Sequence, residues 1–116
     1  MGAGMKDILL PDDCQTMSDV RAGVDETDRA LMALLDRRYG YMRAAARIKP
    51  DRAVVRDEAR KAAVIANARA DAEARSLPAD ALAEIWERLV ESSIAYELVE
   101  WDRLSAEAGP PSARAR

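Results

Sequence analysis

A periodic row of side chains between residues 20 and 48 constrains the fold more than any other feature of this sequence. Its members recur at alternating spacings of four and three residues: Val20, Val24, Thr27, Leu31, Leu34, Arg38, Tyr41, Ala45 and Ile48. This spacing places side chains on one face of an α-helix. Thr16 or Ser18 is suited to cap such a helix, and Pro50 moves Lys49 out of the helical region. The sequence therefore predicts one helix of about 30 residues and ~45 Å.

Two further helices are expected. The segment from about Val55 to Arg75 is rich in alanine, and no Asn-Gly or Asp-Gly pair signals a β-hairpin. Another helical segment starts near Pro78 and continues to about Ala106. We expect an all-α fold of three helices in one domain, residues 12–106. A flexible N-terminal segment, residues 1–11, and a flexible C-terminal tail, residues 107–116, would flank it.

The length of the first helix has a consequence for assembly. A compact monomer of 116 residues has a radius of gyration near ~13 Å, so a ~45 Å helix would protrude from it. The apolar row would then be exposed to water unless a partner covered it. An intertwined helical homodimer is the simplest partner, because one self-complementary surface supplies both halves of the interface.

Composition excludes several classes of chemistry. The chain has 18 Lys and Arg against 21 Asp and Glu, a net charge of −3, which argues against a nucleic-acid partner bound by bulk positive charge. Without histidine and with one cysteine, it has no Ser-His or Cys-His pair and no imidazole or multi-cysteine metal site. We expect no metal and no cofactor. No apolar run is long enough for a membrane span or a signal peptide, so we expect a cytoplasmic protein with no membrane partner.

Charged residues interrupt the apolar row where burial would be costly. Arg38 occupies a position of the row, and a desolvated guanidinium needs an anion. It could pair with an internal carboxylate, extend to solvent, or bind an anionic ligand. Lys49 lies eleven residues later and projects from the same side, although a helix-end lysine can also be merely solvated. Arg21 is seventeen residues, or ~25 Å, from Arg38, so only Arg21 of the partner subunit could reach it.

Charged residues stand in unfavourable positions at two other places in the sequence. Glu97 stands beside Ile94 and Leu98, where it could donate a hydrogen bond when protonated or form a salt bridge to a neighbouring helix. Arg56 and Arg60 open the second helix, where cations oppose the helix dipole. They indicate a nearby anion, or they are solvated surface arginines.

Taken in order, these residues resemble the all-helical chorismate mutase family, including its isochorismate pyruvate-lyase branch. The likeness covers about residues 12 to 104, and its landmarks are Asp19-Val20-Arg21, Leu34-Leu35-Asp36-Arg37-Arg38, Ala44-Ala45-Ala46-Arg47-Ile48-Lys49, Val55-Arg56-Asp57-Glu58-Ala59-Arg60 and Ile94-Ala95-Tyr96-Glu97. The resemblance implies an intertwined dimer with two sites, each enclosed mainly by one subunit.

The resemblance also assigns roles to particular residues. Arg38 and Arg21 of the partner subunit would bind the carboxylates of a dianionic substrate, chorismate. Lys49 would donate to the ether oxygen and an adjacent carboxylate, and Arg60 would add a cationic contact.

Four more positions carry implications from the family. Asp57 matches a position that binds through its backbone, and Ser93 one that contacts the ring carboxylate. Glu97 falls where a glutamine usually donates to the ether oxygen. Lys61 departs from the pattern, because many family members have a glutamate there that holds the ring hydroxyl.

The implied activity is that of an isomerase, rearranging chorismate to prephenate in aromatic amino acid biosynthesis. This pericyclic reaction needs no nucleophile, metal or proton transfer, which suits the residues present. Isochorismate pyruvate lyase activity, giving salicylate and pyruvate, needs the same carboxylate clamp, and the Pro11-Asp12-Asp13-Cys14 stretch looks like that branch. A non-catalytic helical dimerisation module would also explain the rows and the alanines. It gives no reason for Arg38, Lys49 and Glu97 to lie among them.

Overall fold

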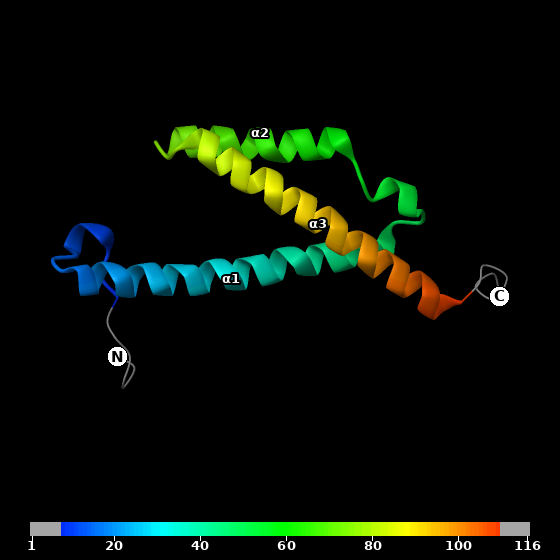
Figure 1. Cartoon of the computed structure of the whole chain (residues 1–116), viewed down its shortest axis with the longest axis horizontal. Coiled ribbons are helices and arrows are strands. Elements are labelled where there is room, and N and C mark those ends of the chain that lie inside the picture. Colours follow the sequence, from blue (N-terminus) through cyan, green and yellow to red (C-terminus); the bar gives the residue numbers. More distant parts are fainter. Residues whose placement is uncertain (1–7, 110–116) are drawn as a thin grey trace. The chain divides into compact units, whose positions relative to one another are not determined.

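The computed structural model describes residues 8–109. Residues 1–7 and 110–116, which belong to the two ends expected to be flexible, lie outside the described range. Within it the chain is helical and has no strand (Figure 1). The elements in order are η1 Pro11–Asp13, α1 Met17–Ile48, η2 Arg52–Val54, α2 Glu58–Ala74 and α3 Ala79–Ala108. The predicted all-α fold with one long helix is confirmed. None of the described helices is long and apolar enough to cross a membrane.

The chain divides into two compact units, one ending at Arg38 and the other beginning at Tyr39. The first contains the start of α1, where Thr16 and Asp19 cap the helix reciprocally. The Thr16 hydroxyl accepts from the Asp19 amide at 3.0 Å, and the Asp19 carboxylate accepts from the Thr16 amide at 3.2 Å. This capping box satisfies amide groups that have no partner within the helix, and it explains why α1 begins there.

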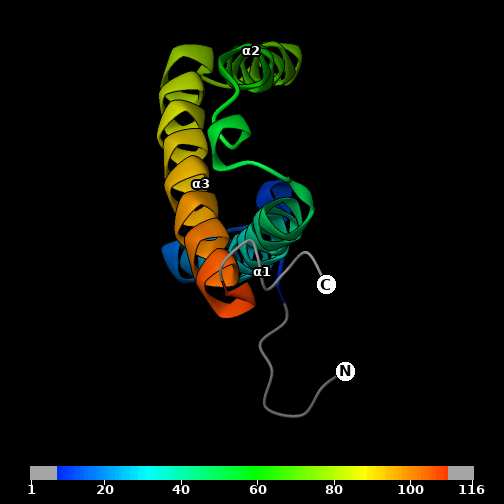
Figure 2. The same ribbon diagram turned by 90° about the vertical axis from the view of Figure 1, so that its right-hand side faces the viewer.

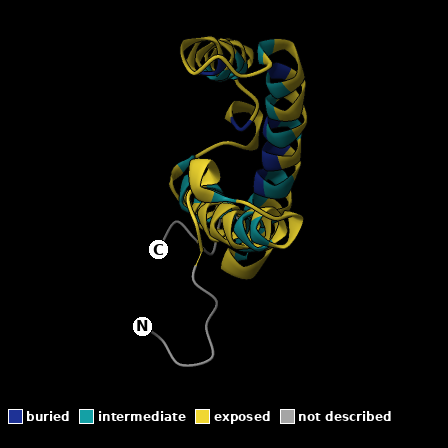
Figure 3. Ribbon diagram, turned by 90° about the vertical axis from the view of Figure 1, so that its left-hand side faces the viewer, coloured by how far each residue is buried: buried dark blue, intermediate teal, exposed yellow. Residues whose placement is uncertain are grey.

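The apolar row of α1 is exposed in both units. In the first unit, Leu31 is 50% and Leu34 58% exposed, and in the second, Tyr41 is 60% and Ile48 70% exposed. In Figure 3, most of α1 is coloured as exposed or intermediate. The chain alone thus leaves this face uncovered, as its periodicity predicts.

In the second unit, α2 packs against α3 and the connection between α1 and α2 packs against α3 as well (Figure 2). The core is small: Val55 from the connection meets Val90 and Ile94 of α3. Partly buried apolar side chains surround it, namely Val64, Ile65, Leu98 and Trp101. No large side chain among the described residues is completely removed from water.

Side chains join the end of α1 to α3. The hydroxyls of Tyr39 and Ser92 lie 2.7 Å apart, and Arg43 Nη1 donates to the Tyr96 hydroxyl at 2.8 Å. The rings of Tyr39 and Tyr96 meet edge to face with centroids 4.9 Å apart, a favoured geometry for aromatic pairs. These contacts fix the last turns of α1 on the middle of α3.

The second helix begins later than the sequence predicts. Val55 lies in the connection, and α2 starts at Glu58 because the side chain of Asp57 caps it. The Asp51 side chain similarly accepts from the Ala53 amide at 3.0 Å, which forms η2. The third helix starts after Pro78 as expected and ends at Ala108, two residues beyond the expected end.

Candidate active site

An ion pair between Lys49 and Glu97 is the centre of the candidate site. Lys49 Nζ lies 2.8 Å from Glu97 Oε2, and the side chain of Glu97 is only 5% exposed, against 29% for Lys49. Glu97 is one of two buried polar residues in the described part of the chain. A buried carboxylate requires a compensating cation, and Lys49 provides it.

The position of Lys49 is fixed at three points. Its amide continues the helical pattern of α1 by donating to the Ala45 carbonyl at 2.9 Å. Its own carbonyl accepts the indole N–H of Trp101 at 3.1 Å, and its ammonium lies 3.4 Å from the Val55 carbonyl. The last carbonyls of a helix have no partner within it, so the indole of α3 stabilises the end of α1.

Glu97 forms the salt bridge that the sequence left open as an alternative to a protonated donor. Glu97 Oε2 is buried, and no aligned hydrogen bond to it is present among the described residues, so the ion pair with Lys49 is the interaction that compensates its burial.

Ser93 lies one turn before Glu97 on α3 and is also buried. Its hydroxyl donates to the Leu89 carbonyl at 2.7 Å, a bond to the preceding turn that is common for serine within helices. The proton of this hydroxyl is therefore used within the helix.

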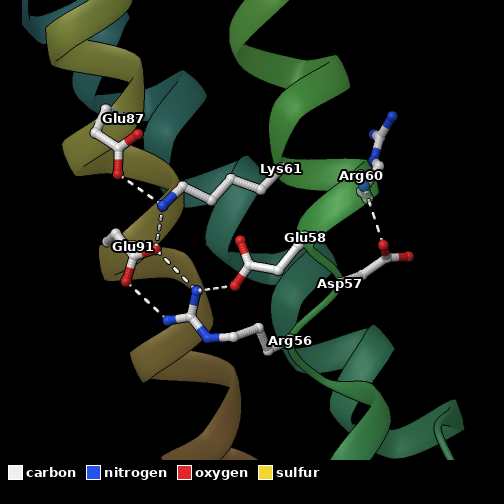
Figure 4. A network of polar contacts seen from close by, with 7 residues as sticks. All are labelled: Arg56, Asp57, Glu58, Arg60, Lys61, Glu87 and Glu91. Atoms are coloured by element: carbon white, nitrogen blue, oxygen red, sulfur yellow. Dashed lines mark hydrogen bonds and ion pairs between the residues drawn. The ribbon is translucent and has the colours of Figure 1, made fainter.

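Asp57 and Arg60 form the first turn of α2, and both are exposed. Asp57 Oδ1 accepts from the Arg60 amide at 3.0 Å, and the Asp57 carbonyl accepts from the Lys61 amide at 2.9 Å (Figure 4). The Asp57 carboxylate is thus occupied as a cap, and a role of this residue in substrate binding stays a prediction. In Figure 4 the Arg60 side chain points away from α3.

A network between α2 and α3 was not predicted from the sequence (Figure 4). Arg56 binds Glu91 in a bidentate manner and also contacts Glu58, while Lys61 contacts both Glu87 and Glu91. Arg56, and then Lys61, lower the pKa of Glu91 to about 2. Hydrogen bonds to Glu87 and Glu91 raise the pKa of Lys61.

This network explains Arg56, one of the two arginines that the sequence places at the start of the second helix. The anion near Arg56 is supplied by the protein itself, from a helix that begins more than 20 residues later. Lys61, which stands where relatives of the resembled family have a glutamate, has its ammonium engaged by two carboxylates of α3. No local sequence signal connects residues so far apart.

The other predicted residues, Arg21 and Arg38, belong to the first unit. Arg21 is exposed and lines a pocket with Ser18 and Asp25, whereas Arg38 is half-buried. Their approach to Lys49 and Glu97 stays a prediction. The structure brings together Lys49 and Glu97, and it places Ser93 beside Glu97 on the same helix. Among residues 8–109, no cluster of three or more His, Cys, Asp or Glu residues is suited to hold a metal ion.

Comparison with known proteins decides the family. The sequence model of the family described as chorismate mutase type II matches residues 20–98, which include Arg21, Arg38, Lys49 and Glu97. The chain belongs to this family. The resemblance found in the sequence is thereby confirmed. An isochorismate pyruvate lyase of Pseudomonas aeruginosa is 29% identical over 91 residues, which cover 78% of this chain and 90% of that protein. The chain is thus similar both to a family named for a mutase and to a relative named for a lyase reaction.

Proposed function

We propose that this protein is a chorismate mutase, an isomerase that rearranges chorismate to prephenate in aromatic amino acid biosynthesis. The observation that carries the proposal is the buried Lys49–Glu97 pair, in a chain of the chorismate mutase type II family. The pair holds an ammonium and a carboxyl group side by side, and the family resemblance assigns both residues a contact with the ether oxygen of the substrate. The active form is a homodimer in which each site receives one arginine from the other subunit.

Substrate binding depends on charge. Chorismate is a dianion whose enolpyruvyl arm must fold over the ring before the new C–C bond can form. Arg38 and Arg21 of the partner subunit hold its two carboxylates, and Arg60 adds positive charge. Fixing this folded conformer removes much of the entropic part of the barrier.

The rearrangement itself is assisted by Lys49 and Glu97. When the dianion enters, its carboxylate and ether oxygen compete with Glu97 for the ammonium of Lys49. Glu97 then takes a proton from solvent and donates a hydrogen bond to the ether oxygen. As the C–O bond stretches, negative charge grows on this oxygen, so both donors bind the transition state more strongly than the ground state. The backbone of Asp57 and the hydroxyl of Ser93 orient the ring and its carboxylate.

Isochorismate pyruvate lyase activity is the second candidate. It is favoured by the Pseudomonas aeruginosa relative, which carries that name and matches most of both chains. This reaction also breaks the C–O bond of the enolpyruvyl arm, and it produces salicylate and pyruvate. The same carboxylate clamp and the same donors to the ether oxygen would serve it.

Product analysis distinguishes these candidates. The protein is incubated separately with chorismate and with isochorismate, and prephenate, salicylate and pyruvate are measured. Prephenate formation at a much higher kcat/KM than salicylate formation is the expected result, and the reverse order would assign the chain to the lyase branch. A transition-state analogue of the mutase reaction should also raise the unfolding temperature, because a ligand that binds only the folded state stabilises it. A dimerisation module without a site would show neither turnover nor this shift.

A further inference from the structure

The connection between α1 and α2 is tied to α3 by two arginines. Arg52 binds Asp102 through Nε at 2.8 Å and Nη2 at 3.2 Å, and Arg56 binds Glu91 through Nη2 at 2.8 Å and Nη1 at 3.0 Å. Both contacts are bidentate, the geometry in which arginine binds a carboxylate most specifically. We call residues 49–57 the strap.

The two attachment points lie on either side of Glu97. Glu91 precedes it by six residues and Asp102 follows it by five. Their separation of eleven residues is close to three helical turns, so both point from the same face of α3, ~17 Å apart. The strap therefore runs along α3 past the level of the buried carboxylate.

Between its two attachments the strap contacts the core and the candidate site. Val55 is 3% exposed and packs on Val90 and Ile94. The Val55 carbonyl also faces the ammonium of Lys49, which is the first residue of the strap and the ion-pair partner of Glu97. Any movement of the strap away from α3 would thus disturb the position of Lys49.

The arginine contacts themselves are accessible to water. The side chains of Arg52 and Arg56 are 53% and 43% exposed. Exposed ion pairs contribute little stability, so each contact can open and close without unfolding the domain. Such contacts are suited to shift the population of a local closed state rather than to hold the fold together.

We propose that Arg52 and Arg56 are positioning residues that hold the strap closed over the Lys49–Glu97 pair and so prearrange the site for its dianionic substrate. This inference rests on the proposed function. Neither arginine touches the reacting atoms; both act through the strap. Substrate binds to the closed form, so its apparent affinity falls in proportion to the fraction of molecules that are closed. Bound substrate restores closure, so KM responds more than kcat.

The test compares Arg56→Gln and Arg52→Gln with a matched control, Arg69→Gln. Arg69 also forms an exposed ion pair from α2 to α3, with Asp80, but it lies outside the strap. Amide hydrogen exchange followed by mass spectrometry is measured on the ligand-free proteins. Exchange in residues 51–57 should accelerate in both strap variants and remain at the wild-type rate in the control. Equal exchange in all four proteins would overturn the proposal.

Kinetics supply the second measurement. Each strap variant should raise KM about two- to fivefold, the range expected from losing one exposed ion pair, with little change in kcat. Arg56→Lys should recover part of the loss, since an ammonium can still contact Glu91. A KM equal to that of wild type in both strap variants would reject the positioning role, and so would an equal increase in Arg69→Gln.

The two proposals can fail separately. Hydrogen exchange requires no substrate. If the strap exchanges faster in the two variants, but the wild-type protein turns over neither chorismate nor isochorismate, the proposed function alone is rejected. If the wild-type protein turns over substrate, but amide exchange in residues 51–57 is unchanged in both strap variants, the positioning role of the two arginines alone is rejected. Circular dichroism and the unfolding temperature establish that each variant is folded, and a variant that is not folded is replaced by Glu91→Gln or Asp102→Asn, which remove the same contacts from α3.

Discussion

The ammonium of Lys49 and the carboxylate of Glu97 lie 2.8 Å apart at a place where the glutamate side chain is 5% exposed. Two residues that are expected to act on the same substrate oxygen are therefore in contact with each other before substrate binds. Each neutralises the cost of burying the other. The proposed catalysis and the stability of the fold thus involve the same pair, and they can be separated by changing one partner or both.

Replacing Lys49 with methionine should reduce both stability and activity. Lys49→Met leaves Glu97 buried without a cation, which should cost about 3 kcal/mol in the free energy of unfolding. The loss of one preorganised donor should lower kcat by about 10²- to 10³-fold. Urea unfolding and a chorismate assay measure the two effects. The double variant Lys49→Met/Glu97→Gln should recover stability but not activity. A double variant as unstable as the single one would contradict the importance of the pair for the fold.

Replacing Glu97 with glutamine should make activity less sensitive to pH. Glutamine donates a hydrogen bond at every pH, whereas glutamate donates only with a proton. We expect kcat/KM of the wild type to decline as the pH rises, and Glu97→Gln to flatten this decline. Steady-state kinetics from about pH 5 to pH 9 provide the measurement. A wild-type profile that is level throughout would remove Glu97 from the role of donor.

Replacing Arg38 with alanine tests the carboxylate clamp. Arg38→Ala should lower kcat/KM by at least about 10²-fold, because a charge-assisted contact to the substrate is lost. The helical content and the oligomeric state should be unchanged, as judged by circular dichroism and size-exclusion chromatography. Near-normal turnover in Arg38→Ala would place the clamp elsewhere. Arg37→Ala, at the preceding residue, serves as the control.

Acid should weaken the network between α2 and α3. Arg56 and Lys61 lower the pKa of Glu91 from its ordinary value of 4.5 to about 2. A carboxyl group whose pKa is lowered in the folded state stabilises the fold above about pH 4.5, and this contribution disappears as the pH falls toward 2. Glu91→Gln should therefore be less stable than wild type at neutral pH, with a difference that shrinks in acid. Urea unfolding at several pH values measures it, and a difference that does not shrink in acid would contradict this role of Glu91.

A charge placed on the apolar row of α1 should prevent the association of two subunits. Leu34→Asp introduces a carboxylate at a row position that is 58% exposed in the single chain. Burying it against a second subunit would be costly, so analytical ultracentrifugation should detect monomers. Met32→Asp is the control, because Met32 is equally apolar and 66% exposed but lies off the row. Dimers of both variants with wild-type affinity would show that the row does not form the interface.

The long helix and its ends could be predicted because their causes are local. Periodicity defines α1, a capping residue starts it, and Pro50 limits its end. The start of α2 could not be placed, because Asp57 and Asp51 compete with the helix for nearby backbone amides. The composition of residues 55–57 does not distinguish the first turn of a helix from the connection that the structure shows.

The candidate site could be predicted only in part. The anomalous positions of Lys49 and Glu97 in the sequence identify them as residues that need partners, yet nothing in the sequence shows that they are partners of each other. The contacts of Arg52 and Arg56 with α3 join residues 50 and 35 positions apart. Such pairings depend on how helices pack, and no local pattern encodes them.

The sparse interior of the chain affects how the protein should behave in dilute solution. Its buried apolar residues are mainly alanines and valines, and no large side chain in residues 8–109 is wholly shielded from solvent. A domain with so little interior gains much of its hydrophobic stabilisation from whatever covers α1. If that is a second copy, the midpoint of thermal denaturation will rise with protein concentration. Specific activity per chain will then fall when an assay is diluted below the dissociation constant.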